Sequence, residues 1–162
     1  MDAVVMDASL DAKELVFLAS DLCEEGFENV ILFSHLSEKD FFYMQISLFE
    51  MGVPAIPLRC NEGDGAARLL KAIRGSLHGS FLLVYSPSIC GYDIERARKE
   101  HRRSGKGATL LLDDSHLAGV YLESEIFDYL EISSDFEKEA LMRIFEDDEG
   151  AIYNLSSYEM TK

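Results

Sequence analysis

The chain has 162 residues, a formal net charge of −15 and 48% hydrophobic residues, which is sufficient for one globular domain with its own core. The acidic excess opposes contact with nucleic acid and with anionic lipid. There is no apolar run of about 18 residues and no signal peptide at the first residues, so we expect a cytoplasmic protein without a membrane segment. Cys23, Cys60 and Cys90 form no CxxC pair, which predicts reduced thiols and argues against a disulfide framework or zinc site.

Strand and helix patterns alternate along the chain. Short apolar runs bounded by turn residues predict strands at residues 3–6, 29–33, 55–58, 81–85, 108–112, 118–122 and 151–155. Apolar residues at helical spacing predict helices at residues 15–23, 38–50, 65–77 and 94–103, and two acidic helical segments follow residue 122. This alternation is typical of right-handed βαβ crossovers. We therefore expect a single α/β domain over residues 1–162, Rossmann-like, with a mostly parallel central sheet.

The strand at residues 81–85 is wholly apolar, as is typical of a strand covered on both faces of a parallel sheet. In open parallel sheets, the loops at the carboxyl ends of the strands carry the ligand chemistry. A catalytic acid is therefore expected in the loop after Tyr85, but this loop holds Pro87 instead.

Several segments resemble the sugar-1-phosphate nucleotidyltransferase superfamily. They are residues 24–33, 63–67, 81–93, 102–110 and 119–127. The family has a glycine-containing base-recognition loop where Gly63, Asp64 and Gly65 stand. The resemblance implies a three-layer nucleotidyltransferase fold, shortened in this chain.

A narrower likeness lies within that superfamily. The chain resembles the nucleotidyltransferase-like domain of the epsilon (or gamma) subunit of the guanine-nucleotide exchange factor for eukaryotic translation initiation factor two. The matching residues are 63–64, 80–85, 92–97, 100–103 and 135–150. The resemblance implies two partners, a homologous gamma-type subunit and translation initiation factor two. A hetero-oligomer is expected, or a homodimer when the chain is isolated.

Three departures from the superfamily pattern concern its catalytic features. Active members bind the triphosphate with a glycine-rich loop followed by Arg and Lys, whereas residues 6–13 contain no glycine and two acids, Asp7 and Asp11. Pro87 stands where the family has its metal-binding aspartate, and it offers magnesium no carboxylate. Only residues 113–117 occupy the place of the sugar-binding insertion. We therefore expect no catalytic residue, no metal site and no cofactor; the opposing hypothesis keeps Mg²⁺ and an NTP.

Two further patterns have alternative interpretations. Gly63, Asp64 and Gly65 match part of a dinucleotide-binding fingerprint, which indicates either a vestigial nucleotide loop or an ordinary loop with a helix cap. Asp113 and Asp114 follow a strand as a metal-binding pair would, but we favour a solvated turn because the partner carboxylate near Pro87 is missing. The four histidines share no metal-binding spacing, which favours structural or surface roles.

Two helical segments are candidates for protein contacts. The helix over residues 41–49 is apolar nearly all round, so it is buried either inside the domain or in a subunit interface, where Phe41, Met44 and Leu48 would face the partner. The helix near residues 94–103 is rich in arginine and lysine. Its outer face is either solvated or docked on an acidic protein surface through Arg98, Arg102 and Arg103.

These observations lead to two functions. The first is a catalytically silent nucleotidyltransferase-like domain that serves as a subunit-assembly scaffold in a translation initiation exchange complex. The second is a divergent minimal sugar-1-phosphate nucleotidyltransferase, which would convert an NTP and a sugar phosphate into a nucleotide sugar and pyrophosphate. The missing phosphate loop, metal aspartate and sugar insertion favour the first.

Overall fold

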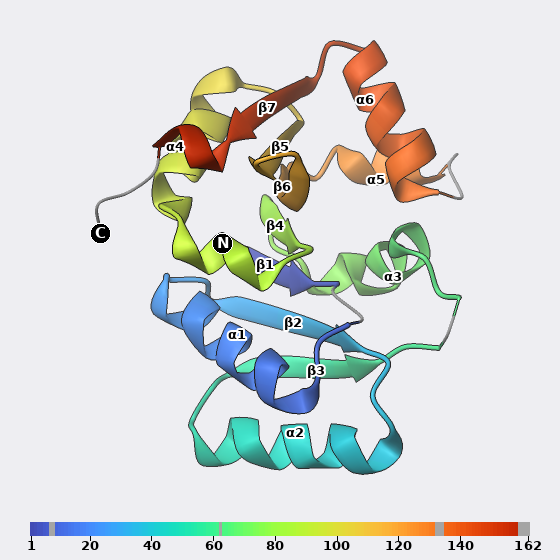
Figure 1. The fold of residues 1–162 in the computed structure, drawn as a ribbon. Coiled ribbons are helices and arrows are strands. Elements are labelled where there is room, and N and C mark those ends of the chain that lie inside the picture. Colours follow the sequence, from blue (N-terminus) through green and yellow to red (C-terminus); the bar gives the residue numbers. More distant parts are fainter. Residues whose placement is uncertain (7–8, 62, 132–134, 159–162) are drawn as a thin grey trace.

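The computed structural model describes residues 1–6, 9–61, 63–131 and 135–158 (Figure 1). The strands are β1 (Asp2–Val5), β2 (Asn29–Ser34), β3 (Ala55–Arg59), β4 (Phe81–Val84), β5 (Ala108–Asp113), β6 (His116–Leu122) and β7 (Gly150–Asn154). The α-helices are α1 (Ala12–Glu24), α2 (Glu38–Glu50), α3 (Ala66–Ile73), α4 (Ile94–Ser104), α5 (Ile126–Glu131) and α6 (Met142–Glu146). A π-helical turn, Phe136–Leu141, leads directly into α6, and 3-10 turns occupy Arg74–Ser76, Pro87–Gly91 and Leu155–Tyr158.

The described strands form one seven-stranded sheet in the order β3-β2-β1-β4-β6-β5-β7. Parallel pairs join β1 to β2 and to β4, β2 to β3, and β5 to β7. Only β6 is antiparallel to its neighbours β4 and β5. The connection between β5 and β6 is a tight turn at Asp114 and Ser115, which is too short for the crossover that a parallel pair requires. The expected α/β fold with a mostly parallel sheet is thus confirmed.

Helices cover both faces of the sheet and make three layers (Figure 1). On one face α1, α4 and the inner side of α2 bury a cluster that includes Leu15, Leu22, Met44, Ala97 and Tyr121. On the other face α3, α5, α6 and the π-helical turn bury a second cluster, which includes Leu70, Leu83, Leu130 and Ile144. The central strands β1 and β4 are buried along their whole length, as the apolar pattern of β4 predicts.

Local capping explains where the main helices begin and end. The α1 helix starts at Asp11, which forms a capping box with Glu14. The hydroxyl of Ser37 accepts the Asp40 N–H at 3.2 Å and so caps α2, as the sequence predicts. The α4 helix begins at Asp93 and ends at Gly105, whose φ of 66° suits the left-handed cap position. None of the helices within the described ranges has the length and apolar character that a membrane crossing demands.

Candidate functional site

Six strands end at the same edge of the sheet. Strands β1 to β4 are parallel, β5 runs in the same direction because β4 and β5 are both antiparallel to β6, and β7 is parallel to β5. Their carboxyl ends bring together the described loop residues 6, 9–11, 35–37, 60–61, 63–65, 85–93, 113–116 and 155–158. We call this the carboxyl edge; it is where ligands bind in open parallel sheets.

The segment expected at the phosphate position caps α1 in this chain. Its residues 7 and 8 lie outside the described residues. The Asp11 Oδ1 atom accepts the Glu14 N–H at 2.8 Å, and the Glu14 carboxylate accepts the Asp11 N–H at 3.2 Å. A phosphate at a helix amino terminus needs such backbone N–H groups and the positive end of the helix dipole. At α1 the Asp11 carboxylate already accepts the Glu14 N–H and occupies the position that a phosphate would take.

Gly63, Asp64 and Gly65 form the turn that leads into α3. Gly63 has a positive φ of 87°, and Gly65 is the N-cap residue of the helix. Asp64 Oδ2 accepts the Asn61 N–H at 2.9 Å, and Asp64 Oδ1 lies 3.3 Å from the Arg68 guanidinium. Asp64 therefore holds its own turn and pairs with the first turn of α3. These contacts are those of an ordinary loop and helix start, and nucleotide binding at this turn stays a prediction.

The loop after β4 is joined to the end of β5. Pro87 opens the 3-10 turn, and the Ser86 hydroxyl accepts the Ser88 N–H at 3.3 Å. The Tyr92 hydroxyl donates to Asp113 Oδ1 at 2.6 Å. Hydrogen bonds from Tyr92 and then from Ser88 lower the pKa of Asp113. The carboxylate of Asp113 thus acts as a hydrogen-bond acceptor for the β4 loop.

Asp114, the second residue of the aspartate pair, lies in the exposed turn between β5 and β6. It has a positive φ of 54°, which short polar residues tolerate better than most. The favoured interpretation of this pair as a turn is therefore confirmed for Asp114. Asp113, in contrast, belongs to β5.

The loops of the carboxyl edge contain no lysine or arginine. Their described acidic residues are Asp11, Asp64, Asp93, Asp113 and Asp114. Carboxylates repel the phosphates of a nucleotide unless a metal ion lies between them. No group of three His, Cys, Asp or Glu residues that could hold a metal ion occurs within the described ranges. The described part of this edge therefore lacks a ready-made group of metal ligands, and binding of a magnesium-bound NTP there stays the opposing prediction.

A cysteine and a histidine meet at the carboxyl edge, a contact that the sequence pattern does not indicate. Cys60 Sγ lies 3.4 Å from His35 Nε2 and 3.3 Å from the Ser34 carbonyl oxygen. Burial raises the pKa of the Cys60 thiol, and the charge of Asp64 raises it further. A thiol with a raised pKa remains protonated at neutral pH and is a poor nucleophile. The pair therefore lacks the thiolate that cysteine catalysis requires.

The structure contradicts the placement of Met44 and Leu48 at a partner interface. Met44 is 0% exposed and Leu48 is 3% exposed, and both belong to the core of this domain. Phe41 is partly buried against the same core. The spacing of these three residues places them on the inner side of α2. The exposed apolar residues of α2 are Phe42, Tyr43, Ile46 and Phe49.

The basic residues predicted to bind protein on α4 are largely paired within that helix. Arg98 lies 2.5 Å from Glu95, and Arg103 lies 2.9 Å from Glu100. Arg102 is exposed. Pairs of this kind reduce the positive potential of the helix surface. Docking of Arg98, Arg102 and Arg103 onto an acidic protein stays a prediction.

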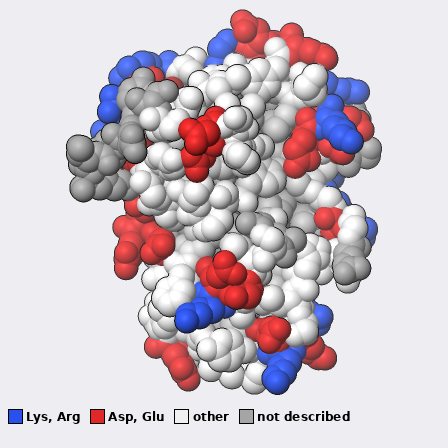
Figure 2. Space-filling view, viewed as in Figure 1, with Lys and Arg blue, Asp and Glu red and all other residues white. Residues whose placement is uncertain are grey.

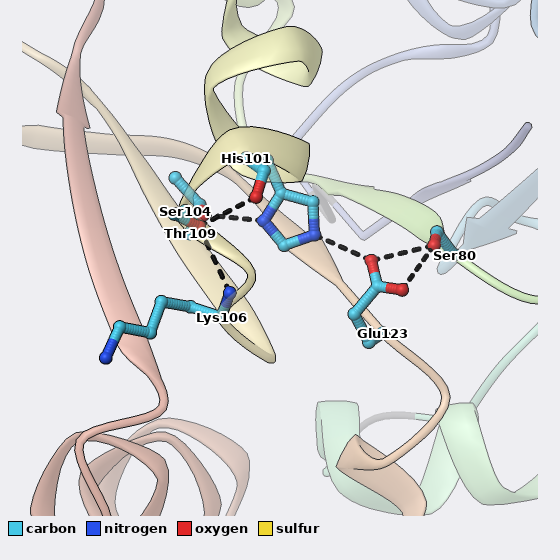
Figure 3. A network of polar contacts seen from close by, with 6 residues as sticks. All are labelled: Ser80, His101, Ser104, Lys106, Thr109 and Glu123. Atoms are coloured by element: carbon cyan, nitrogen blue, oxygen red, sulfur yellow. Dashed lines mark hydrogen bonds and ion pairs between the residues drawn. The ribbon is translucent and has the colours of Figure 1, made fainter.

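A buried histidine connects three elements at the opposite edge of the sheet (Figure 3). His101 of α4 is 2% exposed; its Nδ1 lies 2.6 Å from Thr109 Oγ1, and its Nε2 lies 2.7 Å from Glu123 Oε2. The Ser80 hydroxyl donates to Glu123 at 2.7 Å. A serine hydrolase places the histidine between the serine and the acid, whereas here Glu123 lies between Ser80 and His101. The geometry is that of a structural network.

Two hollows lie beside this network, with volumes of about 480 and 330 Å³. Both have Lys106, Glu123 and Glu125 in their walls, and the larger also has Asp128 and Glu149. The Lys106 ammonium is bound to the carbonyl oxygen of Asp148 at 2.5 Å. The larger hollow has four acids beside Lys106, which disfavours a phosphate ligand, and the smaller also has His101 and Arg102 in its walls.

No protein-family model and no curated protein matches the chain. Solved structures do. One, assigned as a glucose-1-phosphate thymidylyltransferase from Bacillus anthracis, aligns with a TM-score of 0.65 and 9% identity over 94% of this chain and 85% of that chain. Molybdopterin-guanine dinucleotide biosynthesis protein A from Archaeoglobus fulgidus aligns with a TM-score of 0.57 and 15% identity over 98% and 85%.

A third similar structure is CMP:2-keto-3-deoxy-manno-octonic acid synthetase complexed with CTP. It aligns with a TM-score of 0.61 and 10% identity over 95% of this chain and 88% of that chain. Identities this low show the fold and leave the activity open. The chain therefore has the α/β fold of nucleotidyltransferase-like enzymes.

Proposed function

We propose that this chain is a catalytically silent nucleotidyltransferase-like domain that acts as a scaffold for subunit assembly. The observation that carries the proposal is the carboxyl edge, whose loops contain acidic residues but no lysine or arginine. Nucleotidyl transfer develops negative charge on the reacting phosphate, and enzymes stabilise that charge with metal ions or basic side chains. The described residues of these loops include no group of three metal ligands and no lysine or arginine.

The carboxylates of this edge support the same proposal through their contacts. Asp11 caps α1, Asp64 pairs with Arg68, and Asp113 accepts the Tyr92 hydroxyl. Each of these groups holds a loop or a helix terminus in place. A catalytic carboxylate, in contrast, leaves its lone pairs free for a metal ion. These three carboxylates of the carboxyl edge therefore serve to stabilise the fold.

A large exposed apolar surface elsewhere on the domain supports an assembly role. Exposed phenylalanine, tyrosine and isoleucine side chains gather on α2, and Phe17 of α1 is 52% exposed beside them. Large exposed apolar patches on a folded domain mark protein contacts. A domain that has kept the fold but has no fitting nucleotide site can act through such a surface.

The narrower form of the proposal places the chain in the exchange complex of translation initiation factor two. It is supported by the likeness of residues 80–85 and 92–97 to the epsilon-subunit domain. In this form, the partners are a homologous gamma-type subunit and the initiation factor itself, and the complex is cytoplasmic. The net charge of −15 agrees with protein partners and with the absence of direct nucleic-acid contact.

Pyrophosphate release tests the general proposal. The chain is incubated with each NTP, a panel of sugar phosphates and Mg²⁺, beside a variant with Asp113→Asn and Asp114→Asn. We expect no release above the protein-free background from either protein. Mg²⁺-dependent turnover that the double substitution abolishes would show that the chain is a divergent sugar-1-phosphate nucleotidyltransferase.

Copurification tests the narrower proposal. The tagged chain is isolated from its own cells, and the bound proteins are identified by mass spectrometry. We expect a homologous gamma-type subunit together with translation initiation factor two. Recovery of a different, stoichiometric set of partners would contradict the exchange complex while leaving a scaffold role intact.

A further inference from the structure

The exposed apolar residues of the chain are concentrated at one end of the molecule, beside the edge strand β3. Among the described residues, the large exposed hydrophobic side chains lie on α1, on α2 and its C-cap, and on β3, except for Met142 and Ile152. We call six of them the α2 face: Phe17, Phe42, Tyr43, Ile46, Phe49 and Met51. In Figure 2 the uncharged surface over α1 and α2 is bordered by both acidic and basic groups.

The α2 face has a ridge with a hollow on each side. Phe49 is 87% exposed and Phe42 is 62% exposed, so both project outward from the helix. On one side, α1 and α2 enclose a hollow of about 220 Å³ that includes Phe17 and Tyr43; on the other, α2 and β3 enclose one of about 250 Å³. An apolar cavity of roughly 150 Å³ accommodates benzene. Each hollow is therefore large enough for an aromatic side chain of a second α2 face.

The apolar area of this face matches that of a stable interface. Aromatic side chains expose roughly 150–250 Å² each when fully accessible, so the exposed fractions of these six residues correspond to roughly 600 Å² of apolar surface. A standard interface buries about 800 Å² on each partner, including its polar rim. The largest apolar patch of a typical monomer is about 300–600 Å². The α2 face is thus sufficient for a specific complex without further apolar surface.

The edge strand β3 does not offer a continuous sheet to a partner. The Cys60 N–H donates to the Ser34 carbonyl of β2 at 2.9 Å. Alternate residues of a strand turn their N–H groups to opposite sides, so position 57 faces away from β2. That position is Pro57, which has no N–H to donate and so interrupts pairing along the open edge. Contact at this end of the molecule therefore falls to the helix.

The dipoles of two α2 helices favour an antiparallel arrangement. The first turn of α2 carries Glu38, Lys39 and Asp40, and the last carries Glu50; Lys39 and Glu50 are exposed, and neither makes an ion pair with another described residue. In an antiparallel pair, Lys39 offsets the repulsion between the two acids of its own turn and Glu50 of the other copy. Charges farther than about 8 Å from the contact are screened at physiological salt, so the net charge of −15 does not prevent it.

We propose that the α2 face is the interface between two copies of this chain, related by a two-fold axis with their α2 helices antiparallel. Phe42 and Phe49 of each copy enter the hollows of the other. Such an interface is isologous, because each copy contributes both the ridge and the hollows. The inference rests on the proposed assembly function and identifies the surface that serves it.

Sedimentation equilibrium of the full chain, from low micromolar to several hundred micromolar, tests this interface. We expect a reversible monomer–dimer equilibrium. Phe49→Asp and Phe42→Asp should each raise the dimer dissociation constant by about tenfold or more, because central aromatic residues dominate interface energy. Ile152→Asp is the matched control, because Ile152 is 62% exposed on β7, away from α2. Its dissociation constant should equal that of the unmodified chain, and circular dichroism should show all variants folded.

A charge exchange tests the antiparallel arrangement separately. Lys39→Glu should weaken the dimer, because three acids of the first turn would then face Glu50 of the other copy. Adding Glu50→Lys should recover it, because those acids would then face a lysine. A chain that stays monomeric at every concentration would overturn the proposal, even if it bound a different protein. So would a dimer that tolerates Phe49→Asp, or a Lys39→Glu variant that the added Glu50→Lys does not rescue. None of these results alters the pyrophosphate assay, so failure of the interface and failure of the silent-scaffold proposal are distinguishable.

Discussion

His101 and Glu123 lie 22 positions apart in the chain, yet His101 Nε2 is 2.7 Å from Glu123 Oε2. The contact joins the last turns of α4 to the end of β6, and the buried Thr109 hydroxyl of β5 meets the other ring nitrogen of His101 at 2.6 Å. Because His101, Thr109 and Glu123 supply one another's hydrogen-bond partners in or near the core, this network stabilises the fold only when all three residues are present.

Replacement of His101 should therefore destabilise the domain. In His101→Leu the Thr109 hydroxyl and the Glu123 carboxylate lose a partner, and leaving buried polar groups unpaired costs about 1–3 kcal/mol. Urea unfolding followed by circular dichroism measures the change. His116→Leu, at the exposed β5–β6 turn, should alter the free energy of unfolding by less than about 0.5 kcal/mol. Equal stability of the two variants would contradict a structural role for the network.

Gly119 is required by close packing between β6 and its neighbours. A Cβ atom there would lie 2.8 Å from Ile89 Cδ1 and 2.9 Å from the Leu83 carbonyl oxygen. We expect Gly119→Ala to lower the free energy of unfolding by about 1–3 kcal/mol, as overpacking does. At Gly91 a Cβ would meet no atom within 4 Å, so Gly91→Ala is the control and should be nearly neutral in the same urea titration.

The capping role of Asp11 gives a third expectation. Asp11→Ala removes the acceptor for the Glu14 N–H and should destabilise the domain by about 1 kcal/mol. Asp21→Ala, on the exposed side of the same helix, removes an equal charge without removing a cap. Thermal unfolding should show a lower Tm for the first variant alone. An equal drop in both would mean that charge, and not the cap, stabilises α1.

Acid should reveal the hydrogen bonds of Asp113. Tyr92 and Ser88 lower the pKa of this carboxyl below its ordinary value of 3.8. A carboxyl with a lower pKa in the folded state stabilises the fold above its unfolded pKa, and this contribution is lost as the pH falls through the folded pKa. The unmodified chain should therefore have a higher Tm than Asp113→Asn at neutral pH. The difference should shrink as the pH falls below 3.8, and a constant difference would argue against this linkage.

The fold was largely predictable because local signals agree with it. Ser37 before an apolar helical pattern places α2 at Glu38–Glu50, and the apolar run at residues 81–85 indicates the buried central strand β4. The antiparallel direction of β6 was less evident, because a strand pattern alone does not give the direction of the strand. The two-residue connection at Asp114 and Ser115 indicates that β6 is antiparallel to β5, because it is too short for a crossover.

The candidate site was predictable only in part. The lack of glycine in residues 6–13 and the presence of Pro87 are visible in the sequence, because they concern residue type alone. The sequence did not show which side of α2 faces the core, because a helix that is apolar nearly all round has two sides that could be buried. Only packing shows that Met44 and Leu48 face the core while Phe42 and Phe49 face outward. Contacts between distant residues, such as Cys60 with His35, leave no local signal.

Calorimetric titration of the chain with ATP and with GTP, in the presence of Mg²⁺, tests the central claim most directly. The loops of the carboxyl edge have no lysine or arginine, and their described carboxylates hold helix starts and loops. We therefore expect either no heat of binding or a dissociation constant on the order of millimolar. A Mg²⁺-dependent dissociation constant in the low micromolar range would show a functional nucleotide site and contradict catalytic silence.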